Sequence, residues 1–156
     1  MKITLKDKEL ELRRLKVKDI QEFTEYVKGL VLSEINKNAS YIVDKKERVD
    51  FRVSAFENVN FDKKIAEYGQ TQDGLFWLAN RTADINIEDM LDIKDYDDQQ
   101  IAFTIAKIVA YGRGMDVTDI EKMDIEFEKL MAKDKEEIED TEKKTEEIVE
   151  PTEETK

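Results

Sequence analysis

Cysteine and histidine are both absent from this chain of 156 residues. Without cysteine there are no disulfides and no zinc-thiolate sites, and without histidine there is no imidazole general base. The serines lie in no Gly-x-Ser-x-Gly motif, and the glycines form no phosphate-binding loop. The acidic run at residues 92–98 lacks the glycine and the final glutamate of a calcium loop. We therefore expect a protein that is not an enzyme, with no catalytic residue, no metal site and no cofactor.

Positive charge and long apolar segments are also scarce. The formal net charge is −12, and an acidic surface repels the phosphate backbone of nucleic acids. The basic cluster Arg13, Arg14, Lys16 and Lys18 could contact phosphate, but its predicted partners are acidic, which favours a solvated surface. No apolar run is long enough to span a bilayer, and no secretory signal is present. We expect a cytosolic protein without nucleic-acid or membrane partners.

The densest apolar segment, Gly69–Ile93, contains the only tryptophan. Thr71 is a suitable helix N-cap, Asp73 complements the positive end of the helix dipole, and the apolar spacing that follows predicts a helix. A break at residues 84–86 comes next, where Asn86 can cap a second short helix. The residues expected to point inward from that second helix are Ile87, Met90, Leu91 and Ile93.

The first residues predict a β-hairpin, because apolar and polar residues alternate on either side of a polar turn at Lys6–Glu9. One face of this hairpin carries the aliphatic residues Ile3, Leu5, Leu10 and Leu12. From about residue 17 to residue 38, apolar residues recur every three or four positions, which is the strongest helix pattern in the sequence. The residues on that helical face are Ile20, Phe23, Val27, Leu30, Val31 and Ile35.

Residues 41–58 fit two different structures. The alternation of apolar and polar residues over 48–56 is typical of a strand. Against it, Asp44 followed by Glu47 three residues later is similar to the capping box at the start of a helix, and Val49, Val53 and Phe56 also form a helical stripe. We favour the helix.

Three further helices are expected. The first covers residues 60–68, with Asn60 as N-cap and Gly69 ending it in the left-handed conformation. The second covers residues 101–111, which are apolar on nearly every side, and two nearby glycines stop it. The third covers residues 117–131, and its narrow apolar stripe either packs on the domain or meets another protein.

The segment Gly69–Ile93 and the amino-terminal hairpin together resemble the tail assembly chaperones of long-tailed bacteriophages. In that family an aromatic, leucine-rich helix ends in arginine, and a proline-containing break leads to a Thr-x-Glu-Glu-Val type of turn. The matching residues here are Gly74, Trp77, Arg81, Glu88 and Asp89. The break in this chain lacks proline, and Asn86 stands where the threonine is usual. The resemblance covers roughly residues 1–115 and also implies a helix within residues 41–58.

The composition changes beyond Lys133, where acidic residues dominate and the only proline, Pro151, occurs. Such a segment cannot bury enough apolar surface to offset the entropy of ordering it, although isolated helix can persist into its Glu/Lys-rich beginning. We expect a helical domain at residues 1–131 and a disordered acidic tail at residues 132–156. The predicted fold class is mainly α with a small amino-terminal β-hairpin (α+β), a compact helical domain plus that tail.

The resemblance implies a function in virion morphogenesis. It implies a non-enzymatic chaperone that binds the long helical tape measure protein and keeps it soluble in the host cytoplasm until the tail tube polymerises, and that is absent from the mature virion. The tail tube protein and a second copy of this chain are further candidate partners. Large apolar residues on neighbouring helices cannot all point into one small core. The candidate partner-binding residues are therefore Phe76, Trp77, Phe103, Ile105 and Tyr111, each of which has membership of the core as its alternative.

Two other functions fit the same pattern. A small structural or adaptor subunit of a phage tail or head-tail connector would remain in the assembled particle. An acidic regulator that mimics nucleic acid would need carboxylates along one ordered face, whereas half of the net charge lies in the predicted tail.

Overall fold

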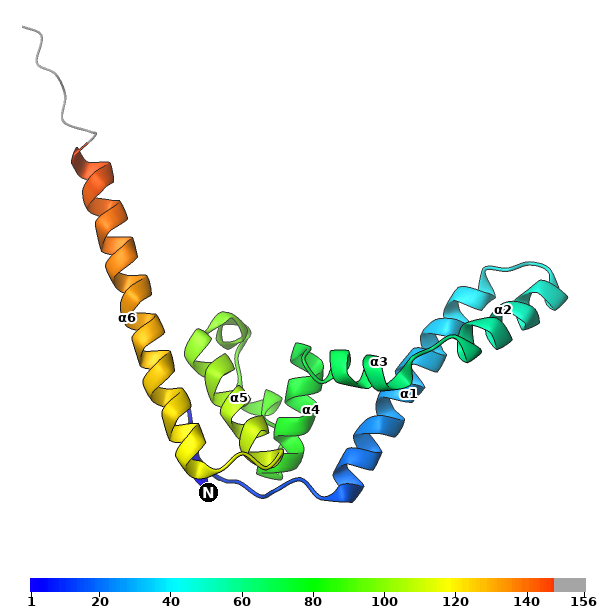
Figure 1. The fold of residues 1–156 in the computed structure, drawn as a ribbon, viewed down its shortest axis with the longest axis horizontal. Coiled ribbons are helices and arrows are strands. Elements are labelled where there is room, and N and C mark those ends of the chain that lie inside the picture. The colour runs from blue at the N-terminus through cyan, green and yellow to red at the C-terminus, as the bar shows by residue number, and fades with distance from the viewer. Residues whose placement is uncertain (148–156) are drawn as a thin grey trace, which may run out of the picture. The chain divides into compact units, whose positions relative to one another are not determined.

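A two-stranded hairpin, six α-helices and two short 3₁₀ helices make up residues 1–147, the part of the chain that the computed structural model describes (Figure 1). Side chains are described for all of these residues except 93, 97 and 134–147. The chain forms two units, of which the first spans Met1–Met115 and the second begins at Asp116. The predicted fold class, mainly α with an amino-terminal β-hairpin, is confirmed.

The hairpin pairs β1 (Lys2–Leu5) with β2 (Lys8–Glu11) in antiparallel register. Lys6 and Asp7 alone connect the strands, and Lys6 has a positive φ of 52°. The predicted turn at Lys6–Glu9 was therefore too long, since its second half pairs within the ladder. Leu5, Leu10 and Leu12 of the predicted aliphatic face are buried, and Ile3 is partly buried.

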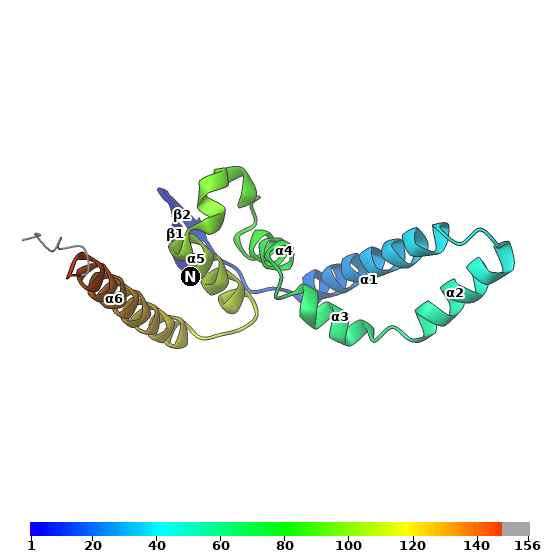
Figure 2. The ribbon, with the colours of Figure 1, turned by 90° about the horizontal axis from the view of Figure 1, so that it is seen from above.

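The core of the first unit lies between this hairpin, α4 (Gln72–Ala83), α5 (Gln99–Gly112) and the first half of α1 (Val17–Ser40). α4 and α5 lie side by side, as Figures 1 and 2 both show. Thr71 caps α4, as predicted, and Asp98 caps α5. The buried apolar residues of this core are Leu5, Leu10, Leu12, Phe23, Val27, Phe76, Leu78, Ala79, Ala83, Ile87, Ile105, Ile108 and Val109.

α1 belongs to this core along only part of its length. The predicted helix is confirmed, and on its apolar face Phe23 and Val27 are buried while Ile20 and Leu30 are exposed. Apolar spacing identifies a face, but it does not say how far the core extends along that face. Beyond Val27, α1 runs away from α4 and pairs with α2 (Lys45–Glu57) instead (Figures 1 and 2).

The choice left open at residues 41–58 is resolved in favour of a helix. The carboxylate of Asp44 accepts hydrogen bonds from two backbone N–H groups in the first turn of α2. Arg48 then closes the preceding loop by donating from Nε to the carbonyl oxygen of Ile42 at 2.9 Å. The cap at Asp44 was thus the informative local signal, because an alternating pattern needs a neighbouring strand to become a sheet.

α3 (Phe61–Tyr68) is capped by Asn60, as predicted. Gly69 ends this helix in the right-handed region, at φ −65°, so the predicted left-handed end was wrong. The N–H of Thr71 donates to the carbonyl oxygen of Tyr68 at 3.0 Å, which turns the chain directly from α3 into α4. The helix therefore needs no left-handed glycine to end.

A left-handed residue does end α4, at Asp84, where φ is 54°. The next turn, η1 (Glu88–Met90), is not capped by Asn86 as predicted. Instead the side-chain oxygen of Asn80 accepts a hydrogen bond from the N–H of Ile87 at 2.8 Å, so the cap comes from the preceding helix. Ile87 is fully buried, as predicted.

η2 (Ile93–Asp97) connects this turn to α5. An ion pair of 2.6 Å between Lys6 Nζ and an Asp95 carboxylate oxygen ties η2 to the hairpin. Met90 and Leu91 are partly buried against the core, as predicted, while the side chain of residue 93 lies outside the described residues.

The second unit contains α6 (Val117–Glu147). The predicted domain boundary at residue 131 falls inside this helix, which continues to Glu147, and the glutamate and lysine residues that are frequent there favour a helix. The part of the predicted disordered tail at 132–147 is thus helical, and residues 148–156 lie outside the described residues. No helix among the residues described is long and apolar enough to cross a bilayer.

Candidate functional site

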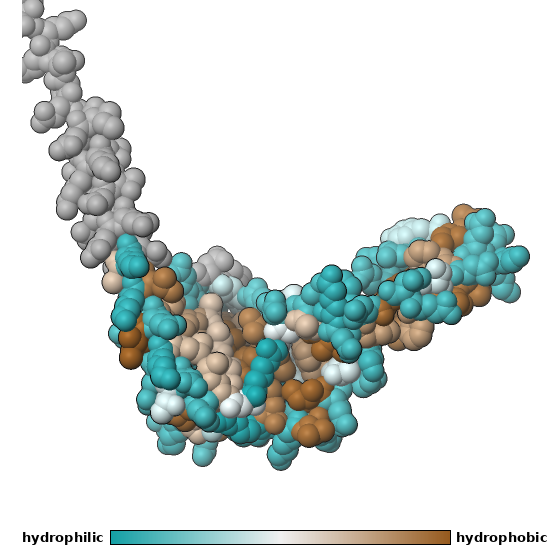
Figure 3. Space-filling model, in the orientation of Figure 1, coloured by the Kyte–Doolittle hydropathy of each residue, from teal (hydrophilic) through white to brown (hydrophobic). Residues whose placement is uncertain are grey.

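The pairing of α1 with α2 leaves large apolar side chains at the surface. Every residue of α2 and α3 is described, and none of them is buried. Figure 3 shows apolar side chains reaching the surface over the α1 and α2 end of the first unit. The large apolar residues that are between 38% and 93% exposed there are Leu30, Leu32, Tyr41, Val43, Val49, Phe51, Val53 and Phe56.

A groove of about 400 Å³ runs between the second half of α1 and α2. It is lined by Leu32, Ile35, Asn36, Arg52, Val53, Phe56 and Glu57. On α2, Val49, Val53 and Phe56 follow one another at a spacing of four and three residues, which places them on one side of the helix. We call the set Leu32, Ile35, Val49, Val53 and Phe56 the hairpin surface, after the helical hairpin that α1 and α2 form, which is distinct from the β-hairpin.

Most of the hairpin surface lies on α2, a helix that depends on packing for its stability. α2 has 13 residues, and isolated helices of this length are marginal in water. Valine and phenylalanine lose side-chain freedom in a helix and so lower its propensity further. About half of the area of Val53 and of Phe56 nevertheless faces solvent. Contiguous apolar surface of this kind typically marks a site of interaction with another molecule.

The charges around the hairpin surface are nearly balanced. Lys28–Asn58 contains six basic and five acidic side chains, whereas the whole chain carries −12. At the edges of the groove, Arg52 and Glu57 place one charge of each sign. A partner of either charge therefore meets little net repulsion here, and apolar contact decides binding.

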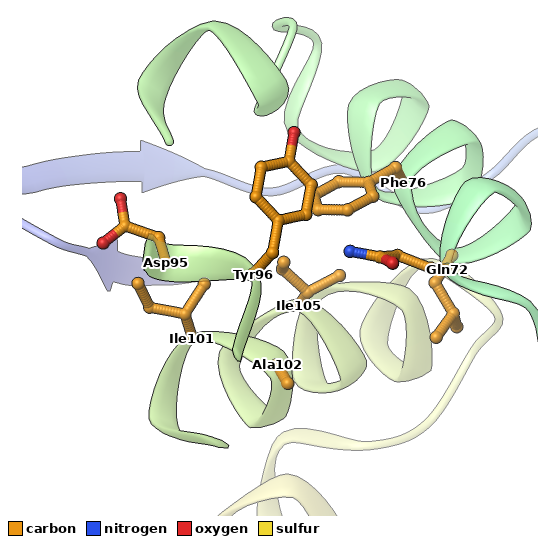
Figure 4. Close-up of a pocket in the computed structure, with 8 residues that line it drawn as sticks. Gln72, Phe76, Asp95, Tyr96, Ile101, Ala102 and Ile105 are labelled. Atoms are coloured by element: carbon orange, nitrogen blue, oxygen red, sulfur yellow. The ribbon is translucent and has the colours of Figure 1, made fainter. Parts of the chain in front are cut away.

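Two of the five predicted partner-binding residues, Phe76 and Ile105, are buried in the core, at 4% and 5% exposure. Both line a cavity of about 260 Å³ between α4, η2 and α5 (Figure 4). The remaining lining residues are Gln72, Leu75, Asp95, Tyr96, Ile101 and Ala102. The structure thus brings these two residues together, on a concave site rather than on an exposed helix face.

Trp77 holds α4 against α1. Its ring centroid lies 5.2 Å from that of Phe23 and 6.3 Å from that of Tyr26, both on α1. The guanidinium of Arg81 lies 5.1 Å from the Trp77 ring and is paired with Glu22 at 2.8 Å. The partly buried Trp77 has a packing role, and its role in partner binding stays a prediction.

The last two predicted residues, Phe103 and Tyr111, are partly buried on α5. The Lys107 ammonium lies 5.1 Å from the centroid of the Phe103 ring, and the Arg14 guanidinium lies 4.0 Å from that of Tyr111. Each ring therefore supports a cation, a contact that stabilises the fold by about 0.5–1 kcal/mol at such sites. Their binding of a partner also stays a prediction.

The hairpin surface was not among the candidate sites predicted from the sequence. The stripe of Val49, Val53 and Phe56 is visible in the sequence and was read there only as evidence for a helix. Its exposure depends on which other elements pack beside α2, and that information is not local. An apolar stripe on a helix with low propensity was the one available signal.

Among the described residues, no cluster of three or more carboxylates is arranged to hold a metal ion. At the start of α1, the Arg13 guanidinium lowers the pKa of the Asp19 carboxyl to about 2. This pair joins the end of the β-hairpin to the start of α1, and Arg13 also lines a shallow groove beside Asp84. No protein-family model, curated protein or solved structure matches the chain.

Proposed function

We propose that this protein is a non-enzymatic tail assembly chaperone of a long-tailed bacteriophage. It binds the long helical tape measure protein in the host cytoplasm, keeps that protein soluble until the tail tube polymerises, and is absent from the mature virion. The observation that carries the proposal is the hairpin surface, an exposed apolar groove between two helices. The resemblance of Gly69–Ile93 to the chaperone family supplies the identity of the partner.

The groove suits an amphipathic helix as its occupant. A helix lying between α1 and α2 would place apolar residues at i, i+3 or i+4 and i+7 against Leu32, Val53 and Phe56. A tape measure protein presents such apolar stripes along a great length before the tube encloses it. The nearly neutral charge of Lys28–Asn58 lets one groove accept successive segments that differ in charge.

The expected affinity of a single site is modest. Full burial of a valine or phenylalanine side chain stabilises by about 1.5–3 kcal/mol, and these side chains are already half buried. The cost of association cancels much of that gain. Many copies on one long partner still cover it effectively, because neighbouring segments raise the local concentration of sites. Weak single sites also allow the chaperone to leave as tube subunits arrive.

The test is coexpression with the long helical protein encoded downstream in the same phage genome. With the wild-type chain we expect that protein to be soluble and to copurify with several copies of the chaperone. Val53→Glu places a charge in the groove and should abolish both effects. Val43→Glu is the matched control, because Val43 is 93% exposed and does not line the groove.

The results separate the proposal from its alternatives. If both variants lose the solubility and copurification of the partner equally, or if neither loses them, the groove does not bind the partner. Retention of the chain in purified particles would favour the adaptor function instead. A wild-type chain that sediments as a dimer, and a Val53→Glu chain that does not, would assign the groove to a second copy.

A further inference from the structure

The cavity between α4, η2 and α5 is separate from the hairpin surface and shares no residue with it. Its floor is formed by the buried side chains of Phe76 and Ile105, and its mouth includes the exposed residues Gln72 and Ala102. Figure 4 shows the side chains of Phe76, Tyr96 and Ile105 gathered around one space. Tyr96 is 42% exposed, so the cavity is reached from solvent without opening the core.

We propose that this cavity binds one uncharged aromatic ring, of about the size of phenyl or indole. The ring is supplied either by a small molecule or by an aromatic side chain of a partner protein. The site is independent of the proposed chaperone function, because its residues lie on other elements than α2.

The volume supports a ring of this size. An enclosed apolar cavity of about 150 Å³ in another protein stays dry and takes up benzene. The present cavity, at about 260 Å³, is larger and leaves room for a bicyclic ring. It lies below the range of about 300–1,000 Å³ that is usual for drug-sized ligands, so the part of a ligand beyond one ring system would extend out of the mouth.

The polarity of the lining excludes a charged ligand. Asp95 is the one charged residue in the lining, and it is already paired with Lys6 Nζ at 2.6 Å and accepts a hydrogen bond from the N–H of Asp92 at 2.7 Å. This pairing lowers the pKa of the Asp95 carboxyl and keeps its charge directed at Lys6. Gln72 leaves one amide at the mouth, which suits a single polar atom such as an indole N–H.

The aromatic residues favour a flat ring over an aliphatic chain. The Phe76 and Tyr96 rings lie 5.6 Å apart at an interplanar angle of 57°. A third ring between them and Ile105 would make edge-to-face contacts, which stabilise beyond simple area burial. An aliphatic ligand would fill the same volume without these contacts.

The experiment uses the full-length chain with isotope-labelled isoleucine methyl groups, titrated with indole. We expect saturable shifts of the Ile101 and Ile105 methyl signals and no comparable shift at Ile35, which lines the other groove. Ala102→Phe, at the exposed mouth, should abolish the shifts. Ala66→Phe on the exposed face of α3 is the matched control and should leave them unchanged.

A second titration distinguishes the source of the ring. N-acetyltryptophanamide carries an indole between two peptide bonds, so binding of both compounds indicates that the side chain of a partner can enter. Binding of indole alone indicates a free small molecule. Shifts that persist in Ala102→Phe, or shifts at Ile105 no larger than those at Ile35, would overturn the proposal. Val53→Glu should bind indole like the wild type, which keeps this result apart from a failure of the chaperone function.

Discussion

Two helical regions of the first unit carry comparable apolar stripes but differ in what covers them. α4 and α5 bury theirs against each other and against the hairpin, with Leu78 and Ile108 almost fully inaccessible. The second half of α1 and α2 pair with each other, and Val53 and Phe56 stay half exposed although the Phe56 ring also contacts Phe61 of α3. The difference shows that an amphipathic pattern defines a surface without defining its partner. In this protein the first region is a core, and the second leaves apolar side chains uncovered within the described residues.

The largest expected effect comes from one methyl group placed in each region. Gly74 lies so close to the backbone carbonyl of Tyr68 that a Cβ would overlap it, so Gly74→Ala should lower the free energy of unfolding by about 3 kcal/mol. Gly29 has no atom near the corresponding position, and Gly29→Ala should raise that free energy by about 0.5–1 kcal/mol through helix propensity. Urea unfolding of both variants measures the contrast. Similar values for the two would contradict the close packing of α3 against α4.

A smaller effect is expected from the ion pair that fixes the start of α1 to the core. Arg13 Nη1 lies 2.7 Å from the buried Asp19 carboxylate and lowers the pKa of that carboxyl from 3.8 to about 2. A lowered carboxyl pKa stabilises the fold above pH 3.8, and this stabilisation is lost as the pH falls towards 2. When the pH falls from about 5 to about 2, the free energy of unfolding of the wild type should therefore decrease by on the order of 1–2 kcal/mol more than that of Asp19→Asn.

Unfolding curves of both chains at the two pH values give this difference directly. Asp19→Asn keeps an oxygen that can accept from the N–H of Lys16, so it removes mainly the charge. If the free energy of unfolding decreases equally in the wild type and the variant, other carboxylates dominate acid unfolding.

The sequence predicted the parts of the fold that local chemistry decides. The caps at Thr71 and Asn60 and the helix that begins after Asp44 were read from single residues, and the structure has them. The ends that depend on neighbouring elements were misread: Gly69 is right-handed because the chain turns at once into α4, and Asn80 replaces Asn86 as a cap. Both depend on contacts between consecutive helices.

The candidate site was predictable only in part. Phe76 and Ile105 were singled out as large apolar residues on neighbouring helices, and they do share one cavity. That cavity also needs Tyr96, which comes from a 3₁₀ turn whose position is set by the Lys6–Asp95 ion pair over a separation of 89 residues. The exposure of Val53 could not be predicted either, because it depends on the absence of a covering element.

The smallest expected effect separates the two regions most clearly. Asp44→Ala removes the cap of α2 at a cost of about 1 kcal/mol, and Thr71→Ala removes the cap of α4 at a similar cost. α2 has no buried residue and opens locally, so Asp44→Ala should speed hydrogen exchange of α2 amides about fivefold and leave α4 and α5 unchanged.

α4 is part of the core and opens only with it, so Thr71→Ala should speed exchange of the slowest amides in α4 and α5 together. If Asp44→Ala speeds exchange in α5 as much as in α2, then α2 and the core unfold as one unit. In that case the side chains of the hairpin surface are held in place before any partner binds. If the acceleration is confined to α2, the helix is held loosely until a partner covers Val53 and Phe56, and binding should slow its exchange more than that of any other described helix.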